Sequence, residues 1–327
     1  MADVVTSVAT FEGVNQELIL KPLYNDPMLL SLGTRNLVTN DPSIFYFNTQ
    51  LNKITVEKSD CGHTYGTGVA FTKKVTNPKV YEAAIEQCYN VFLKTFLGGK
   101  LPAGVRKGEL SPEINEILIG MLNDVFNRDM IRKLFMSDTA SATQFYSSLD
   151  GVYKTLSTDL GGSDQDIGAL TLTDINQTNI QATLYAIYDA QSDMLKDQPD
   201  SAKKLWVTGN VYDAWVRWSQ ANIASYNNDR VIYGIGETEV KFNGIPLIPL
   251  RFVDRAIKAD FTTSGVATDP VRIILTLPEQ HVIQTDSSNI EMSEPWFSWD
   301  DDVYRAACAA EMAYLYGYAE LSVIGGF

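Results

Sequence analysis

Few side chains in this sequence have the types and the spacing that catalysis requires. The 327 residues include only two histidines, His63 and His281, so a histidine-based triad or a multi-histidine metal site has few possible members. His63 lies in a polar, glycine-bearing segment, and His281 follows Pro278 at the start of an apolar run. We therefore expect a surface or structural role for both histidines.

A group of carboxylates near the C-terminus is the other possible metal site. Asp300, Asp301 and Asp302 stand beside Trp296 and Trp299, and clustered carboxylates suit hard divalent cations. Consecutive residues of a strand point to alternate faces, however, so a solvated turn is the expected structure. The sequence predicts no metal site.

Motifs for cofactors and nucleophiles are also missing. Gly234-x-Gly236 lacks the third glycine of a dinucleotide-binding loop, and the chain contains neither G-x-S-x-G nor G-x-x-x-x-G-K-[ST]. We predict no catalytic residue and no cofactor. One alternative stays open, a soluble α+β enzyme that uses Asp or Glu pairs whose positions the sequence does not reveal.

Length, charge and cysteine usage set broad limits. At 327 residues and 45% hydrophobic content, the chain can bury a substantial core and is expected to form about two lobes. A net charge of -14 argues against a protein whose main work is to grip phosphate backbones. Cys61, Cys88 and Cys308 form no C-x-x-C pair, which favours a reducing cytoplasm. No signal segment and no apolar run of ~20 residues occurs, so we expect neither export nor a membrane partner.

Residues 43–76 have the pattern of a long β-hairpin. Residues 44–57 are rich in aromatic and β-branched types, residues 67–75 alternate in part, and the polar segment 58–66 between them predicts the tip. Isolated hairpins are marginally stable in water. We therefore expect this hairpin to lie on another surface. We expect the same of residues 1–42, because they contain prolines and have no single apolar face.

Two helices are predicted next from apolar residues at helical spacing. The first covers residues 80–95. The second covers residues 112–136, with Ser111 as N-cap and Pro112 at the first helical position. Its predicted buried positions are Ile114, Ile117, Leu118, Met121, Leu122, Val125, Phe126, Ile131, Leu134 and Phe135.

A third long helix is predicted to begin near Thr178 and to end before Pro199, with Ile180, Leu184, Ile187, Tyr188 and Gln191 on one face. Thr178 and Gln181 have the spacing of a capping box at its start. Further along the chain, residues 271–277 and 281–285 have the β-branched composition of strands.

The stretch between residues 205 and 250 contains an ordered succession of elements. Residues 205–208 predict a buried strand, residues 240–242 and 245–250 predict two more, and Asn243-Gly244 tolerates the positive φ of a tight turn between them. A helix precedes the turn. Its apolar face consists of Val211, Ala214, Trp215 and Trp218.

This order of strand, helix, polar connection and F-x-G-x-P turn, with Phe242, Gly244 and Pro246, resembles the axial domain of tailed-phage major capsid proteins. Encapsulins and the floor of herpesvirus capsids share that shell fold. The resemblance implies an α+β fold with these parts: an amino-terminal arm at 1–42, an extended loop at 43–76, a peripheral domain at 77–172 with a spine helix at about 112–136, an axial domain at 173–275, and returning strands at 276–327.

The C-terminal segment gives conflicting signals. Residues 306–315 are rich in alanine, and intrinsic preference favours a helix there. In the family that the chain resembles, this end is a long strand, a bend and a final strand. We therefore predict a strand that Asp302 leads into, a bend at Gly317, and a last strand at 321–324.

The resemblance implies a major capsid protein that forms hexamers and pentamers of an icosahedral shell around double-stranded DNA, and not an enzyme. The implied partners are further copies of the chain, a separate scaffolding protein, a portal, decoration proteins and packaged DNA in weak non-specific contact. Assembly is expected in the bacterial cytoplasm and the final location in the virion. The expected assembly contacts are Lys58, His63, Tyr65, Phe71, Trp215, Trp218, Phe242, Gly244 and Pro246.

Some members of that family join subunits by an isopeptide bond between a lysine and an asparagine. The possible amines are Lys53, Lys58, Lys73 and Lys74, but no asparagine lies in register around Val303, Ala310 and Glu311, so we expect no crosslink.

Residues 1–42 lack the length and heptads of a scaffolding segment, and numbering from Met1 implies little amino-terminal processing. An encapsulin-like shell around an enzyme cargo is the main alternative, because it has the same fold.

Overall fold

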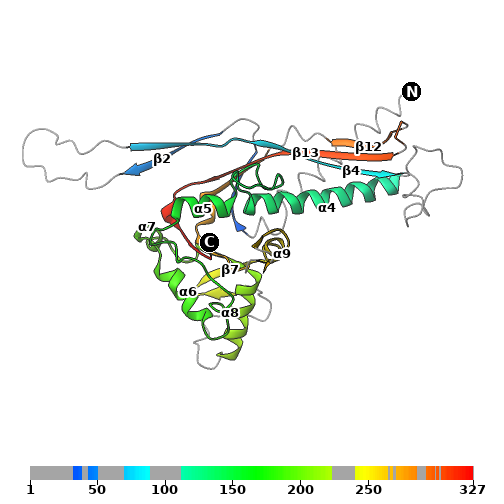
Figure 1. The fold of residues 1–327 in the computed structure, drawn as a ribbon. Coiled ribbons are helices and arrows are strands. Elements are labelled where there is room, and N and C mark those ends of the chain that lie inside the picture. Colours follow the sequence, from blue (N-terminus) through cyan, green and yellow to red (C-terminus); the bar gives the residue numbers. More distant parts are fainter. Residues whose placement is uncertain are drawn as a thin grey trace, which may run out of the picture.

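The computed structural model describes residues 32–38, 43–50, 70–88, 112–222, 240–263, 266–267, 270–285, 292–298, 300–301 and 303–326. They form a long, flat layer with a second body attached to one side and a β-hairpin that extends from one end (Figure 1). The α+β class predicted from the sequence is confirmed.

The flat layer, which we call the plate, consists of one sheet and one long helix. Strand β13 (Val303–Tyr316) is the longest strand and pairs antiparallel with β4 (Lys79–Cys88), β11 (His281–Thr285) and β12 (Met292–Ser298). Strand β1 (Arg35–Val38) adds to β11 in parallel. The sheet therefore joins segments from both ends of the sequence.

Helix α4 (Pro112–Met136) runs along one face of this sheet (Figure 1). Its bounds agree with the predicted long helix, and Pro112 is its first residue as expected. Among the predicted core positions, Leu122, Phe126, Ile131, Leu134 and Phe135 are buried. Val125 is 49% exposed, so its assignment to the core was wrong.

Residues 80–88 were predicted to be helical, and this prediction was wrong. They form the strand β4, and its partner β13 aligns Ala84 with Ala307. Val80 and Ala84 are four residues apart, a spacing that places them on one face of a helix and also on one face of a strand. Both are exposed, whereas Tyr81 packs toward α4. Residues 89–95 lie outside the described residues.

The alanine-rich C-terminal segment is a strand, as predicted. Small side chains at alternate positions of β13 face α4 and allow the helix to approach the sheet closely; they are Ala306, Cys308 and Ala310. The strand ends at Tyr316, next to Gly317, and a further strand β14 (Ser322–Gly325) follows. Packing against a buried helix therefore outweighs the intrinsic helix preference of alanine.

The second body contains another five-stranded sheet with the order β14-β10-β5-β7-β6. The strands after β14 are β10 (Ile273–Thr276), β5 (Lys204–Thr208), β7 (Ile245–Leu250) and β6 (Lys241–Phe242). Helices α6 (Ile180–Asp189) and α8 (Gly209–Ala221) pack on this sheet around a separate apolar core. The strands and helices predicted for this region are confirmed, within shorter bounds for the third long helix.

Several further elements join the plate and the second body. Helix α5 (Val152–Leu160) packs against α4, and α9 (Arg251–Asp260) contacts both α4 and α8. The remaining elements are α7 (Asp193–Lys196), β8 (Thr262–Thr263), β9 (Val266–Ala267) and the 3-10 turns Pro278–Gln280 and Ala319–Leu321. The sequence patterns above predicted neither α5 nor α9.

Two local predictions have different outcomes. Asn243 and Gly244 have φ values of 48° and 85°, which confirms the tight turn between β6 and β7. The capping box of Thr178 and Gln181 was wrong, because α6 begins at Ile180 and its N-cap makes no side-chain bond. Instead, the Asn176 side chain accepts hydrogen bonds from the backbone N–H groups of residues 178 and 179. This Asx-type turn satisfies the Thr178 N–H, one of the two donors that a capping box would have satisfied, together with the Asn179 N–H.

The hairpin strands β2 (Ile44–Gln50) and β3 (Ala70–Val75) pair antiparallel as predicted. They extend beyond the end of the plate in Figure 1. The predicted tip, residues 58–66, lies outside the described residues.

Candidate assembly surfaces

His281 is a buried structural residue, in agreement with the surface or structural role expected for it. Its side chain is fully buried, with Nε2 2.9 Å from the Thr276 hydroxyl and Nδ1 2.8 Å from the Tyr314 hydroxyl. The Trp206 ring lies 4.4 Å away between centroids. Burial lowers the pKa of His281 to about 3, so the ring is neutral at pH 7. Without access to solvent or an adjacent carboxylate it positions β10 against β13. His63 lies outside the described residues.

The aspartates near the C-terminus form a solvated turn where the structure describes them. Asp300 and Asp301 are exposed, and the Asp301 carboxylate accepts hydrogen bonds from Arg305 and Ser298 at 2.7 and 3.2 Å. Asp302 lies outside the described residues. The described part of the chain contains no group of three or more His, Cys, Asp or Glu side chains that could hold a metal ion.

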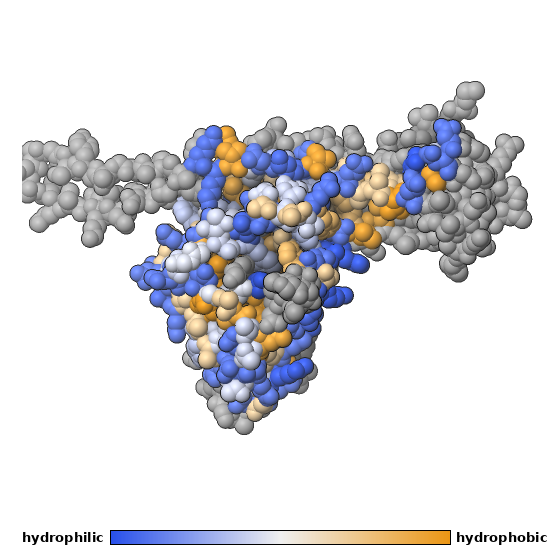
Figure 2. Space-filling view, in the orientation of Figure 1, coloured by the Kyte–Doolittle hydropathy of each residue, from blue (hydrophilic) through white to orange (hydrophobic). Residues whose placement is uncertain are grey.

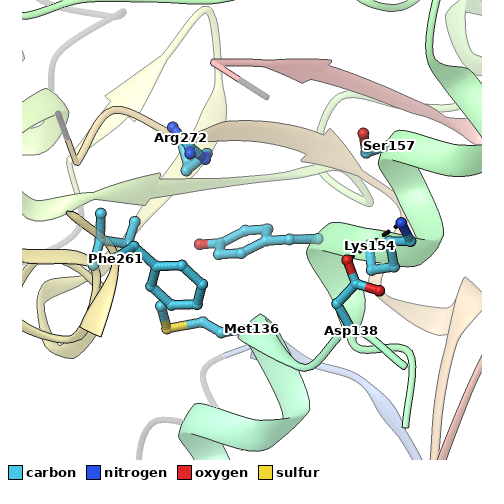
Figure 3. A pocket seen from close by; sticks show the side chains of 8 residues that line it. Met136, Asp138, Lys154, Ser157, Phe261 and Arg272 are labelled. Atoms are coloured by element: carbon cyan, nitrogen blue, oxygen red, sulfur yellow. Dashed lines mark ion pairs between the residues drawn. The ribbon is translucent and has the colours of Figure 1, made fainter. Parts of the chain in front are cut away.

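A cavity of about 350 Å³ lies where α4, α5, α9 and β10 meet (Figure 3). Its polar side chains include Lys154, which forms an ion pair with Asp138 at 3.3 Å, and Arg272, which donates to the carbonyl of Val271. Burial lowers the pKa of Arg272. Ser157 also lines the cavity, but within the described residues no hydrogen bond joins it to Lys154. The lining therefore holds no paired nucleophile and base.

Membrane insertion has no support from the described helices. Among them, none is long and apolar enough to cross a bilayer.

The base of the hairpin is fixed to the plate by polar contacts. The Lys74 ammonium donates to the backbone carbonyls of Tyr316 and Gly317 at 2.9 and 2.8 Å. Thr76 is buried beside it, where its hydroxyl bonds the Gln284 side chain and the Ser43 backbone. The hairpin thus leaves the plate from a defined point, the end of β13.

Three of the five aromatic residues predicted as assembly contacts, Trp215, Trp218 and Phe242, belong to the core of the second body. Trp215 is fully buried, stacks on Trp218 at 4.9 Å between centroids, and meets Phe242 edge-on at 5.2 Å. Its indole N–H donates to the carbonyl of Lys241 at 3.3 Å. Because these rings fill the interior of the subunit, they offer no surface to a neighbour. Their apolar spacing signalled a core face and not an interface.

The other predicted contact residues have mixed positions. Gly244 is exposed and Pro246 is half-buried, at the turn between β6 and β7. Phe71 is part of strand β3. Lys58, His63 and Tyr65 lie outside the described residues. Only the Gly244 turn therefore combines a described position with an exposed surface.

Exposed apolar side chains concentrate on the plate and the hairpin base. On β4, Val80 is 66% exposed, and Ile85 is also exposed. Ile44 and Val75 are cross-strand partners at the hairpin base, and both are exposed. Val125 completes this group on α4. Figure 2 shows apolar patches among the hydrophilic residues of this layer. A single subunit leaves this surface uncovered.

The fold can be compared with known proteins over nearly the full chain. No protein-family model and no curated protein matches the sequence. Among solved structures, the satellite phage P4 procapsid including the size determination (Sid) protein matches with a TM-score of 0.54 and 10% identity, covering 97% of this chain and 90% of that chain.

Two further structures give similar values. Gordonia phage Cozz matches with a TM-score of 0.53 and 11% identity, covering 91% of this chain and 85% of that chain. The capsid of the cyanophage P-SCSP1u matches with a TM-score of 0.52 and 11% identity, covering 89% and 85%. The sequence identity is low, but the fold is shared. The chain therefore has the fold of phage major capsid proteins.

Proposed function

We propose that this chain is the major capsid protein of a tailed bacteriophage, which assembles into hexamers and pentamers of an icosahedral shell around double-stranded DNA. The observation that carries the proposal is the match to phage capsid structures over most of the chain.

The mechanism of such a protein is mechanical. The plate, with α4 beneath its sheet, supplies a rigid wall segment. The hairpin reaches across neighbouring subunits and covers apolar surface there, as does the part of the predicted amino-terminal arm (1–42) that precedes Leu32. Residues 35–38 belong to the plate sheet of their own subunit instead. Such contacts would bury described apolar side chains that a single subunit leaves exposed. They are Val80 and Ile85 on β4 and Ile44 and Val75 at the hairpin base. Obligate interfaces of this kind commonly bury more than about 2,000 Å² in total.

We assign the two proposed domains from the order of the elements along the chain. Residues 77–172 and the strands β11 to β13 supply the peripheral domain, and residues 173–275 supply the axial domain. The last strand, β14, joins the axial sheet beside β10. In the axial domain, the exposed turn at Gly244 is the described contact that we place near the capsomer axis, in place of the buried aromatic rings. Closed symmetry requires that each contact patch meets a complementary patch on the next copy.

Partners and location follow from the same proposal. A separate scaffolding protein, a portal and decoration proteins complete the particle, which assembles in the bacterial cytoplasm. We propose that the subunits are not joined covalently. Lys74 is engaged with backbone carbonyls at the hairpin base, whereas Lys73 is exposed. Denaturing electrophoresis of mature particles checks this point, because a ladder above the monomer band would contradict it.

The test of the cross-neighbour hairpin is a deletion of residues 59–66. We expect a folded subunit that assembles poorly, because only the contact with a neighbour is lost. The matched control shortens the chain elsewhere, in the loop after α5 that contains the exposed residues Gly162 and Asp164. Normal particle yield from the hairpin deletion, with equal yield from the control, would exclude the proposed role of the hairpin.

A further inference from the structure

We infer that the corner between α4 and α9 binds phosphate groups of packaged DNA. A cavity of about 380 Å³ lies there, with Arg128 and Arg132 from α4 and Arg255 from α9 in its lining. Its apolar floor consists of Phe252, Ala256 and Ala259. Guanidinium groups present several donors in one plane and bind phosphate oxygens in pairs. The identity of the polyanion rests on the proposed function.

The charges of the corner are only partly compensated. Arg132 forms ion pairs with Asp260 at 3.0 Å and with Asp129 at 3.7 Å, and the Tyr146 hydroxyl also donates to Asp260. Arg128 and Arg255 are exposed, and neither has an ion-pair partner within the described part of the chain. Arg132 is thus held in place, while two guanidinium groups remain available.

These two arginines stand out against the charge of the whole protein. The chain has 26 Lys and Arg residues but 40 Asp and Glu residues, so a basic residue usually has an acidic group to pair with. Convergence of Arg128, Arg132 and Arg255 on one concave site gives a local positive potential in an acidic protein. Such a site attracts polyanions by charge complementarity.

The opposite face of the plate carries exposed glutamates in place of an arginine group. Glu82 and Glu86 on β4 are exposed and point away from α4. On β13, Glu311 lies on the same face as Val80 opposite it, and Arg305 is occupied by ion pairs with Glu86 and Asp301. Helix α4 has acidic as well as basic residues, so the site that suits contact with DNA is the arginine corner and not the helix as a whole; the face with the glutamates repels DNA. This assigns the α4 face to the interior of the shell.

The solution test compares two double variants of the full-length chain with the same loss of charge. Arg128→Gln with Arg255→Gln removes the two available guanidinium groups, and Arg217→Gln with Lys196→Gln removes two exposed charges on α8 and α7. Binding of a fluorescein-labelled DNA duplex is measured between about 50 and 200 mM salt.

A plot of log affinity against log salt concentration has a negative slope. We expect this slope to become shallower by about two for the first variant and to stay unchanged for the second. Equal slopes for both variants would overturn the inference. Binding of inorganic tripolyphosphate to the arginines without binding of the duplex would overturn the assignment to DNA.

Electron cryomicroscopy of DNA-filled particles supplies the second test. We expect DNA density beside Arg128 and Arg255 that is lost in the arginine variant. DNA density against Glu82 and Glu86 would overturn the inference while leaving the capsid function intact. Particles that contain protein cargo and no DNA would instead contradict the proposed function, even if the duplex binds the arginines in solution.

Discussion

The Lys74 ammonium donates a hydrogen bond to the backbone carbonyl of Tyr316 at 2.9 Å. A second bond at 2.8 Å reaches Gly317. The first residue lies in the hairpin and the other two lie where the sheet of the plate ends, so one side chain joins parts more than two hundred positions apart. This contact sets the point from which the hairpin leaves the plate.

Replacing Lys74 with Met is expected to loosen this attachment. Each bond involves a charged donor, and their loss should lower the free energy of unfolding by roughly 1.5 kcal/mol after allowance for solvent exposure. Hydrogen exchange of the β3 amides and denaturant unfolding measure the change. Lys73→Met is the matched control, because Lys73 is an exposed neighbour. Equal exchange rates in both variants would show that the contact does not hold the hairpin.

We predict that the contribution of Asp254 to the free energy of unfolding increases toward lower pH. Its carboxylate accepts a bond from the Gly209 N–H at 3.2 Å, but burial raises the pKa of Asp254 from 3.8 to about 6. The folded chain therefore binds this proton more tightly than the unfolded chain, and the contribution of this group falls as pH rises from about 4 to 6. Asp254→Asn should remove this dependence.

The measurement for Asp254 is the free energy of unfolding of the wild type and the variant across that pH range. Asp193→Asn is a suitable control, since Asp193 is exposed in α7. Parallel pH curves for wild type and Asp254→Asn would contradict the prediction.

His281 predicts the opposite pH dependence. Burial lowers the pKa of His281 from 6.5 to about 3, so between these values the unfolded chain binds a proton that the folded chain does not. The contribution of His281 to the free energy of unfolding is fully present above about pH 6.5. Below that pH it falls by up to about 1.4 kcal/mol per pH unit. His281→Gln keeps a donor and an acceptor but does not titrate, so its unfolding curve should be less sensitive to acid. An unchanged acid sensitivity would refute this role for His281.

Substitution of a buried aromatic residue in the second body is expected to impair folding, and not to impair assembly selectively. Trp215→Ala removes a fully buried side chain and should cost about 3–5 kcal/mol in unfolding free energy. Val80→Ala on the exposed face of β4 should change the unassembled subunit by less than about 0.5 kcal/mol. Denaturant unfolding measures both. A Trp215→Ala subunit of normal stability that fails to assemble would restore the interface assignment of Trp215.

Sequence reasoning succeeded where a pattern had only one structural solution. The long apolar repeat of α4 and the Asn243-Gly244 turn are examples, because only one backbone conformation accommodates each. It failed at β4, where residues 80 and 84 fit one face of a helix and one face of a strand equally well. The strand is decided by pairing with β13, more than two hundred residues away, which local patterns do not contain.

The arginine corner could not be found from sequence for the same reason. Arg128 and Arg132 occupy α4 and Arg255 occupies α9, and the sequence gives no sign that these helices meet. The aromatic residues near Trp215 show the converse difficulty. Apolar periodicity identifies a buried face, but it does not say whether the same chain or a neighbour covers it.

The most direct test of the capsid function is negative-stain electron microscopy of the purified protein, expressed with and without its neighbouring genes and fractionated by size. We predict closed shells or capsomer rings, with DNA in the filled shells. A single monodisperse monomer under all conditions would contradict the assembly of this chain into a shell.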